Sequence, residues 1–112
     1  PNTTAAAARQ FARALVMPNL VPPVTTAAAA SDYKTRILSA LAPELTCSAE
    51  VFQPMMTLYL TDDTSPEEIK RCVTGGDVKA AKLYPAGATT NSGSGVTDYN
   101  KISPALQAMA HY

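Results

Sequence analysis

Lys82 is the residue whose surroundings most clearly suggest chemistry. It lies in the apolar run from Val78 to Tyr84, where strand alternation places Ala80, Lys82 and Tyr84 on one face. Burial of an ammonium group disfavours its charged form, and the neutral amine is nucleophilic and can form a carbamate with carbon dioxide. The residues alone leave a second interpretation open, in which Lys82 lies on an edge strand and extends into water.

Two loops carry further candidate ligand groups. Asn19 follows the apolar run from Ala12 to Met17, at a predicted strand end of the kind that binds ligands in α/β folds, and its amide can donate to a carboxylate. Thr89 and Thr90 lie in a loop rich in Gly and Ser that follows the Lys82 strand and could close over a ligand. Either loop could instead be a solvated turn bonded to its own backbone.

For the other polar candidates, the sequence favours structural roles. Asp62 and Asp63 precede a predicted helix, where acidic residues interact favourably with the helix dipole. His111 is the only histidine, so this chain alone can form neither a Ser/His triad nor a multi-histidine metal site. Cys47 and Cys72 lack the spacing of a zinc or redox pair, and we interpret both as reduced and structural.

The elements that must position these residues alternate along the chain. The sequence predicts helices over about 3–11, 27–41, 65–74 and from 97 or 98 onward, and strands over 12–17, 53–61 and 78–84. This order requires parallel strands with right-handed crossovers, as in a doubly wound sheet or a (β/α)₈ barrel. No boundary interrupts it, so residues 1–112 are expected to be part of a single domain.

Local signals define two of these helices. Ser65, Pro66 and Glu68 predict a helix start with a side-chain cap, a first-turn proline and a reciprocal carboxylate. The helix over residues 27–41 should be capped by one of two preceding threonines and should pack on the sheet through one stripe. The predicted members of that stripe are Tyr33, Ile37, Leu38 and Leu41.

Length and composition limit what the chain can do. Its 112 residues are too few for a complete (β/α)₈ barrel, which needs roughly 250. The formal net charge of +0 gives no indication of nucleic-acid or membrane binding. With neither a signal peptide nor a membrane-length apolar run, the expected location is the cytoplasm. The sequence opens directly in a helical run, so we expect a segment of a longer polypeptide.

Two motifs resemble dihydroorotases, specifically the bacterial and fungal single-function type. The first runs from Val16 to Thr25 and the second from Ala80 to Thr97, in the family's order and spacing. The resemblance covers nearly the whole chain. It implies a segment, about strands 2 to 4 with flanking helices, of a (β/α)₈ TIM barrel of the metal-dependent amidohydrolase type.

The resemblance also implies an activity and roles for particular residues. Dihydroorotases use zinc to hydrolyse reversibly the cyclic amide of dihydroorotate to N-carbamoyl-aspartate in pyrimidine biosynthesis. Lys82 would be the catalytic N6-carboxylysine that bridges two zinc ions. Asn19 would hold the substrate carboxylate, while Thr89 and Thr90 would close over the substrate. The partners implied are the remainder of the barrel and a second subunit of a homodimer.

Parts of the family pattern are missing from the chain. The His-x-His-x-Arg motif, the later metal histidines and the catalytic aspartate have no counterparts, and Gly87 replaces a common asparagine. We therefore expect a segment that is inactive alone. Two alternatives stay open: a non-catalytic homologue acting as a scaffold or partner subunit, and a free-standing βαβαβ binding module.

Overall fold

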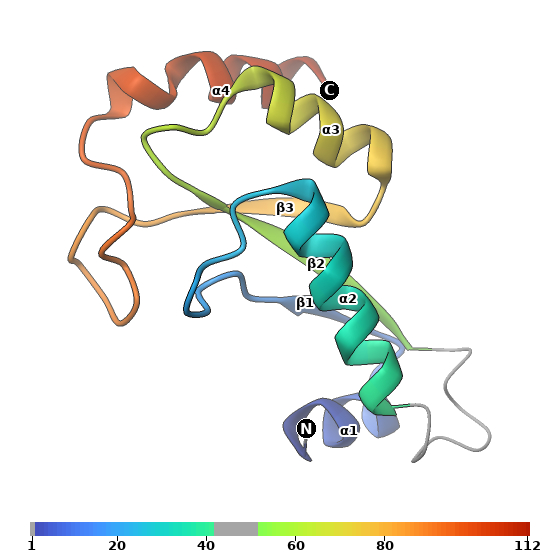
Figure 1. Cartoon of the computed structure of the whole chain (residues 1–112). Coiled ribbons are helices and arrows are strands. Elements are labelled where there is room, and N and C mark those ends of the chain that lie inside the picture. The colour runs from blue at the N-terminus through green and yellow to red at the C-terminus, as the bar shows by residue number, and fades with distance from the viewer. Residues whose placement is uncertain (1, 42–51) are drawn as a thin grey trace.

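The chain alternates helices and strands along its length, as the sequence predicts. The computed structural model describes residues 2–41 and 52–112, so Cys47 lies outside the described residues. The elements are coloured along the chain in Figure 1, and their bounds agree with the predicted ones to within a residue or two. They are α1 (Asn2–Gln10), β1 (Arg13–Val16), α2 (Ala27–Leu41), β2 (Gln53–Leu60), α3 (Pro66–Gly75), β3 (Val78–Leu83) and α4 (Tyr99–His111).

The three strands form a parallel sheet in the order β1-β2-β3. The pairing of β2 with β3 contains one irregularity, because Met56 pairs with Val78 whereas the next residue, Thr57, pairs with Ala80. Lys79 is therefore an extra residue in β3. Beyond this shift the pairing is regular, and Tyr59 is the partner of Lys82.

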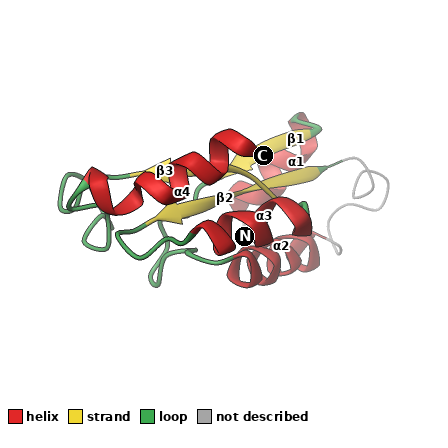
Figure 2. Cartoon of the chain, turned by 90° about the horizontal axis from the view of Figure 1, so that it is seen from above, coloured by secondary structure: helices red, strands yellow, loops and turns green. Residues whose placement is uncertain are grey.

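Helices cover one face of the sheet through two apolar clusters. Near α1 and α2, Met56 of β2 packs with a first group of residues, namely Ala5, Ala8, Val24, Ala30, Ile37, Leu41 and Phe52. Near α3 and α4, Leu58 and Leu60 pack with a second group, namely Ile69, Cys72, Val96, Ile102 and Ala105. Figure 2 shows α2 and α3 side by side along the strands. Since side chains alternate along a strand, Tyr59 and its partner Lys82 lie on the opposite face, which we call the site face.

Polar side chains cap three of the helices at the predicted positions. Thr26 Oγ1 accepts a hydrogen bond from Ala29 N at 3.2 Å, which begins α2. Ser65 Oγ accepts one from Glu68 N at 3.2 Å, which begins α3. Asp98 caps α4, and α3 ends at Gly76 in the left-handed conformation (φ 74°). These caps confirm the helix boundaries that the sequence predicts.

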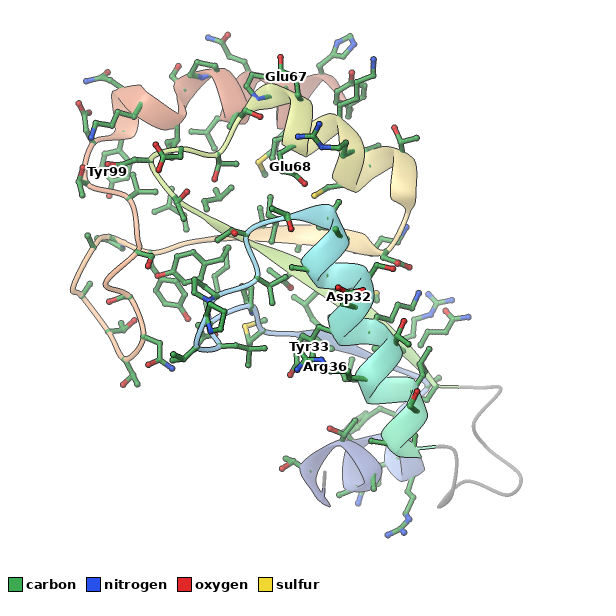
Figure 3. The ribbon with its side chains drawn as sticks, viewed as in Figure 1. Asp32, Tyr33, Arg36, Glu67, Glu68 and Tyr99 are labelled. Atoms are coloured by element: carbon green, nitrogen blue, oxygen red, sulfur yellow. The ribbon has the colours of Figure 1, made fainter. Side chains whose placement is uncertain are left out.

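The prediction that the Glu68 carboxylate bonds back to the start of its own helix, α3, is wrong. Glu68 Oε1 instead accepts a hydrogen bond from Ala27 N, 2.7 Å away at the start of α2, and Oε2 accepts two from Arg71. The first amides of a helix lack partners within the helix, so Ala27 N is an available donor. Figure 3 shows Glu68 pointing from α3 toward α2, while Glu67 points away. Glu68 thus connects two helices rather than closing a cap within one.

The prediction that Leu38 belongs to the buried stripe of α2 is also wrong. Leu38 is 37% exposed, whereas Ala30, Ile37 and Leu41 are buried. Residues separated by seven and eleven positions lie on one side of a helix, and Leu38 is turned about a quarter of a revolution away from Ile37.

In the described ranges, no helix has both the length and the apolar character needed to cross a membrane.

Candidate functional site

The predicted site residues gather at the carboxyl ends of the parallel strands. β1 continues into the loop of residues 17–24, which contains Asn19, and β3 continues into the loop of residues 84–98, which contains Thr89 and Thr90. Both loops lie at the same end of the sheet in Figure 1. In α/β barrels this is the end that carries ligand-binding groups. The fold therefore brings together the two loops that the sequence singles out.

Lys82 lies on the site face near this end of β3. Its Nζ donates to Met17 Sδ at 3.2 Å and is 4.6 Å from the centre of the Tyr84 ring. Its neighbour Ala81 packs against the helix-side cluster, which confirms the predicted alternation. However, Lys82 is only half-buried, so the expected desolvation of its amine is not confirmed. The cause is that β3 is an edge strand among the described residues, and Met17 and Tyr84 cover the amine only in part.

Tyr59 is a site-face residue that the sequence reasoning treated only as part of an apolar strand. It is 0% exposed, and its ring centre is 5.4 Å from that of Tyr84. Its hydroxyl donates to the backbone oxygen of Asn91 at 3.1 Å. Burial, and then the nearby Tyr84, raise the pKa of Tyr59, so it stays a protonated donor. The available signal was that a tyrosine in a buried strand needs a partner for its hydroxyl.

Asn91 joins the two candidate ligand loops. Its Nδ2 donates to the backbone oxygen of Asn19 at 3.2 Å, and its own backbone is in the left-handed region (φ 57°). The side chain of Asn19 is not used in this contact. Asn19 Oδ1 is buried and has no hydrogen-bond partner among the described residues, which argues against the turn interpretation, because a turn residue would bond to its own backbone. Asn19 Oδ1 therefore remains available to accept a hydrogen bond.

Thr89 and Thr90 are exposed, and they lie on a loop held by its own hydrogen bonds. Ser92 is 1% exposed, and its Oγ accepts from Thr89 N at 2.8 Å. Gly95 lies so close to Tyr84 that a Cβ there would be 2.5 Å from the Tyr84 backbone oxygen. Gly87 has a positive φ of 76°. These two glycines thus meet geometric demands of the loop.

Asp62 has a structural role, as the sequence favours, but the hydrogen-bond partners of its carboxylate lie at the start of α4 and not in α3, the helix that follows it. Its carboxylate accepts from Thr97 N at 2.8 Å, from Thr97 Oγ1 at 2.5 Å and from Lys101 Nζ at 2.8 Å. The Lys101 hydrogen bond, followed by those from Thr97, holds the pKa of Asp62 well below its usual value. Asp62 fastens the turn after β2 to the start of α4, at the base of the Thr89 loop.

The structure also accounts for Cys72 and His111. Cys72 is a free, buried thiol in the helix-side cluster, and burial raises its pKa to about 11. His111 packs edge-on against the Tyr112 ring with a centroid distance of 5.0 Å. Within residues 2–41 and 52–112, no three His, Cys, Asp or Glu side chains are grouped as a metal site.

A polar cavity of the described residues is separate from this cluster. It has a volume of about 710 Å³ and lies between the turn after β2, the start of α3 and residues 93–97. None of Asn19, Lys82, Thr89 and Thr90 lines it. Its charged lining residues include Asp62, Glu68 and Arg71, which are already engaged with partners. We therefore place the candidate site on the sheet's site face and not in this cavity.

The fold and the site together define a class of protein. A parallel sheet with helices on one face and ligand groups at its carboxyl end is the arrangement of a (β/α)₈ barrel enzyme segment. Within that class, the curated relatives are dihydroorotases. One from Ectopseudomonas mendocina is 57% identical over 110 residues, which are 98% of this chain and 30% of that protein. One from Cupriavidus taiwanensis is 60% identical over 102 residues, which are 91% of this chain and 28% of that protein.

Solved structures agree with the sequence relatives. The dihydroorotase of Saccharomyces cerevisiae, in complex with 5-fluoroorotic acid, matches with a TM-score of 0.78 and 32% identity, over 96% of this chain and 28% of that one. The Campylobacter jejuni dihydroorotase matches with a TM-score of 0.80 and 34% identity, over 96% and 30%. No family model matches the chain.

The comparisons confirm the resemblance that the two motifs suggest. The chain is similar to dihydroorotases over nearly its whole length and has the fold of a segment of their barrel. It spans about 30% of the length of the curated relatives it matches.

Proposed function

We propose that this chain is a segment of a dihydroorotase, which hydrolyses the cyclic amide of dihydroorotate reversibly to N-carbamoyl-aspartate. The observation that carries the proposal is the convergence of Asn19 and the Thr89 loop beside Lys82, in a chain 57% identical to dihydroorotases. Residues 1–112 would form part of one barrel domain and would be inactive alone. The relatives reported above are all dihydroorotases, which favours this proposal over a non-catalytic homologue.

Lys82 is proposed to act as N6-carboxylysine. Its unprotonated amine would attack carbon dioxide and release a proton, and the resulting carbamate of Lys82, with one negative charge shared by two oxygens, would help to hold the zinc. The half-buried position supports this role, because the amine is both held and accessible. The remaining zinc ligands would come from outside this chain. When bound, zinc would supply Lewis-acid polarisation of the amide carbonyl and lower the pKa of a water molecule.

Substrate binding is assigned to the two loops. The Asn19 amide would donate to the substrate carboxylate without adding charge. The exposed hydroxyls of Thr89 and Thr90 would donate to the substrate from the other side. The position of Asn19 in the loop that follows β1, joined to Asn91 of the other loop, supports this assignment. Its buried Oδ1, which lacks a partner among the described residues, would accept from a separate donor.

The surroundings of the sheet support a larger assembly. β1 and β3 each have one unpaired edge within the described residues, and parallel strands of this kind are normally covered. Beside β3 lies a mainly apolar groove of about 240 Å³ whose lining includes Val73, Met109 and Tyr112. We assign this edge to the remainder of the barrel. The complete protein is proposed to be a cytoplasmic homodimer.

The test is Lys82→Ala in the full-length protein, with zinc content and dihydroorotate hydrolysis measured together. We expect loss of both, together with loss of the carbamate carbon signal in ¹³C NMR after labelling with bicarbonate. Lys79→Ala is the matched control, because Lys79 lies on the same strand and is exposed. The Lys79→Ala variant should keep its bound zinc, its carbamate ¹³C signal and its rate of dihydroorotate hydrolysis. Near-normal hydrolysis by Lys82→Ala would refute the assignment.

A further inference from the structure

Tyr59 contacts both loops of the candidate site. Its backbone N donates to the Val24 backbone oxygen at 2.7 Å, at the end of the loop that contains Asn19. Its hydroxyl donates to the Asn91 backbone oxygen at 3.1 Å, in the loop that contains Thr89. Tyr59 itself belongs to the central strand, β2, between the two strands that carry these loops. A single rigid element thus holds a loop on either side.

The two loops are also connected to each other through Asn91. Asn91 and Asn19 are 72 positions apart in the sequence, and the side-chain amide of Asn91 donates to the Asn19 backbone oxygen. The carbonyl of Asn91 is fixed by Tyr59 while its side chain holds Asn19. The left-handed backbone of Asn91 is one that asparagine tolerates better than most residues. The three residues therefore form a continuous chain from β2 to both loops.

The Tyr59 hydroxyl, which donates to Asn91, has little freedom to move. The Tyr59 side chain is fully buried and its ring packs against Tyr84, so the hydroxyl position is fixed by packing. A buried hydroxyl without a partner would be unfavourable, which favours the arrangement in which Asn91 is held. Thr89 and Thr90 lie immediately before Asn91 in the sequence. Holding Asn91 therefore restrains the threonines as well.

We propose that Tyr59 is a positioning residue that keeps the Asn19 loop and the Thr89 loop in their binding arrangement before the substrate arrives. This inference rests on the proposed function. Tyr59 acts through Asn91 rather than on the substrate. If only part of the population has the binding arrangement, the apparent affinity falls by that fraction, while the bound complex is unchanged. Loss of the Tyr59 hydroxyl should therefore affect KM more than kcat.

The experiment is Tyr59→Phe in the full-length protein, which keeps the ring and removes the hydroxyl. We expect KM for dihydroorotate to rise about fivefold, the factor that corresponds to one neutral hydrogen bond. The kcat should stay within twofold. Amide hydrogen exchange in a peptide covering residues 86–95 should become faster by a similar factor. A purely structural role would instead lower thermal stability and active fraction without changing KM.

Two further variants sharpen the test. Tyr99→Phe is the matched control, because Tyr99 is 62% exposed at the start of α4 (Figure 3). It should change neither KM nor exchange. Asn91→Asp keeps the backbone carbonyl and tolerates the left-handed backbone, but it loses the amide donor to Asn19. Its effect on KM should not add to that of Tyr59→Phe, because both variants break the same chain of contacts.

The outcomes separate this inference from the proposed function. A wild-type protein with zinc but no dihydroorotate turnover would contradict the proposed function, and the exchange data would then decide the positioning role alone. In an active enzyme, an unchanged KM for Tyr59→Phe would overturn the inference. Fully additive effects of Tyr59→Phe and Asn91→Asp would also overturn it, because the two bonds would then act separately.

Discussion

Asp62 and Lys101 form an ion pair of 2.8 Å that joins the turn after β2 to the first turn of α4. Thr97 adds two hydrogen bonds to the same carboxylate. The Asp62 hydrogen bond also raises the pKa of Lys101, so both partners favour their charged forms. The pair closes the base of the loop whose tip carries Thr89 and Thr90.

Asp62→Asn should make the protein less stable at neutral pH and less sensitive to acid. The pKa of Asp62 is lowered in the folded state, so its contribution is present above the unfolded value of about 3.9 and is lost as pH falls through the folded value. Thermal midpoints of the full-length protein at pH 7 and pH 3 should differ less for Asp62→Asn than for wild type. Asp63→Asn, at the exposed neighbouring residue, is the control. An equal acid sensitivity of wild type and Asp62→Asn would contradict the prediction.

Glu68→Ala should loosen the junction between α2 and α3. Loss of the carboxylate leaves Ala27 N without its 2.7 Å acceptor, at a cost of about 1 kcal/mol in the free energy of unfolding. Glu68→Gln retains an acceptor oxygen and should lose less. Glu67→Ala removes an exposed carboxylate from the same helical turn and is the control. Urea denaturation measures all three, and a loss from Glu67→Ala as large as that from Glu68→Ala would refute the assignment.

Gly95→Ala should distort the Thr89 loop. The added Cβ would meet three backbone atoms, including the Tyr84 oxygen at 2.5 Å, and backbone atoms cannot yield as a flexible side chain can. We expect a loss of about 1–3 kcal/mol in unfolding free energy, as for other forced contacts, and a higher KM. Gly93→Ala meets no atom within 4 Å and should be tolerated. Equal stability of the two variants would mean that the close approach does not constrain the loop.

Asn19→Ala should weaken substrate binding far more than it weakens folding. A hydrogen bond to a charged group contributes about 1.5–3 kcal/mol, so KM should rise by roughly 10- to 100-fold. Asn19→Asp should bind still more weakly, because its carboxylate would repel that of the substrate. Steady-state kinetics on the full-length protein, with thermal midpoints alongside, check both variants. Unchanged KM values would exclude Asn19 from the substrate site.

The sequence was sufficient for most of the fold, because its signals are local. Proline at the first helical position, hydroxyl or carboxylate caps and glycine at a helix end each define a boundary through short-range geometry, as Ser65 and Gly76 show. The parallel sheet follows from the alternation of elements. The destination of Glu68 was not predictable in this way. It depends on Ala27, which is distant in sequence and becomes adjacent only when the helices pack.

The candidate site was predictable in its members but not in its connections. Lys82 and Asn19 were found because a lysine in an apolar strand and an asparagine at a strand end are unusual local patterns. Tyr59 escaped notice, since nothing in the strand sequence separates a tyrosine that fills space from one that holds a loop. The half-buried state of Lys82 also depends on tertiary neighbours, which local patterns do not specify.

The extra residue at Lys79 determines which face of the sheet the Lys82 amine occupies. If the pairing continued from Met56 and Val78 without the shift, Tyr59 would lie opposite Ala81, and Lys82 would turn toward the helices. The direction of the amine therefore depends on the number of residues in the strand. One residue more or fewer in this six-residue strand would exchange Lys82 for Ala81 on the site face. Insertions and deletions of one residue in β3 should accordingly be forbidden in active relatives, even where substitutions are accepted.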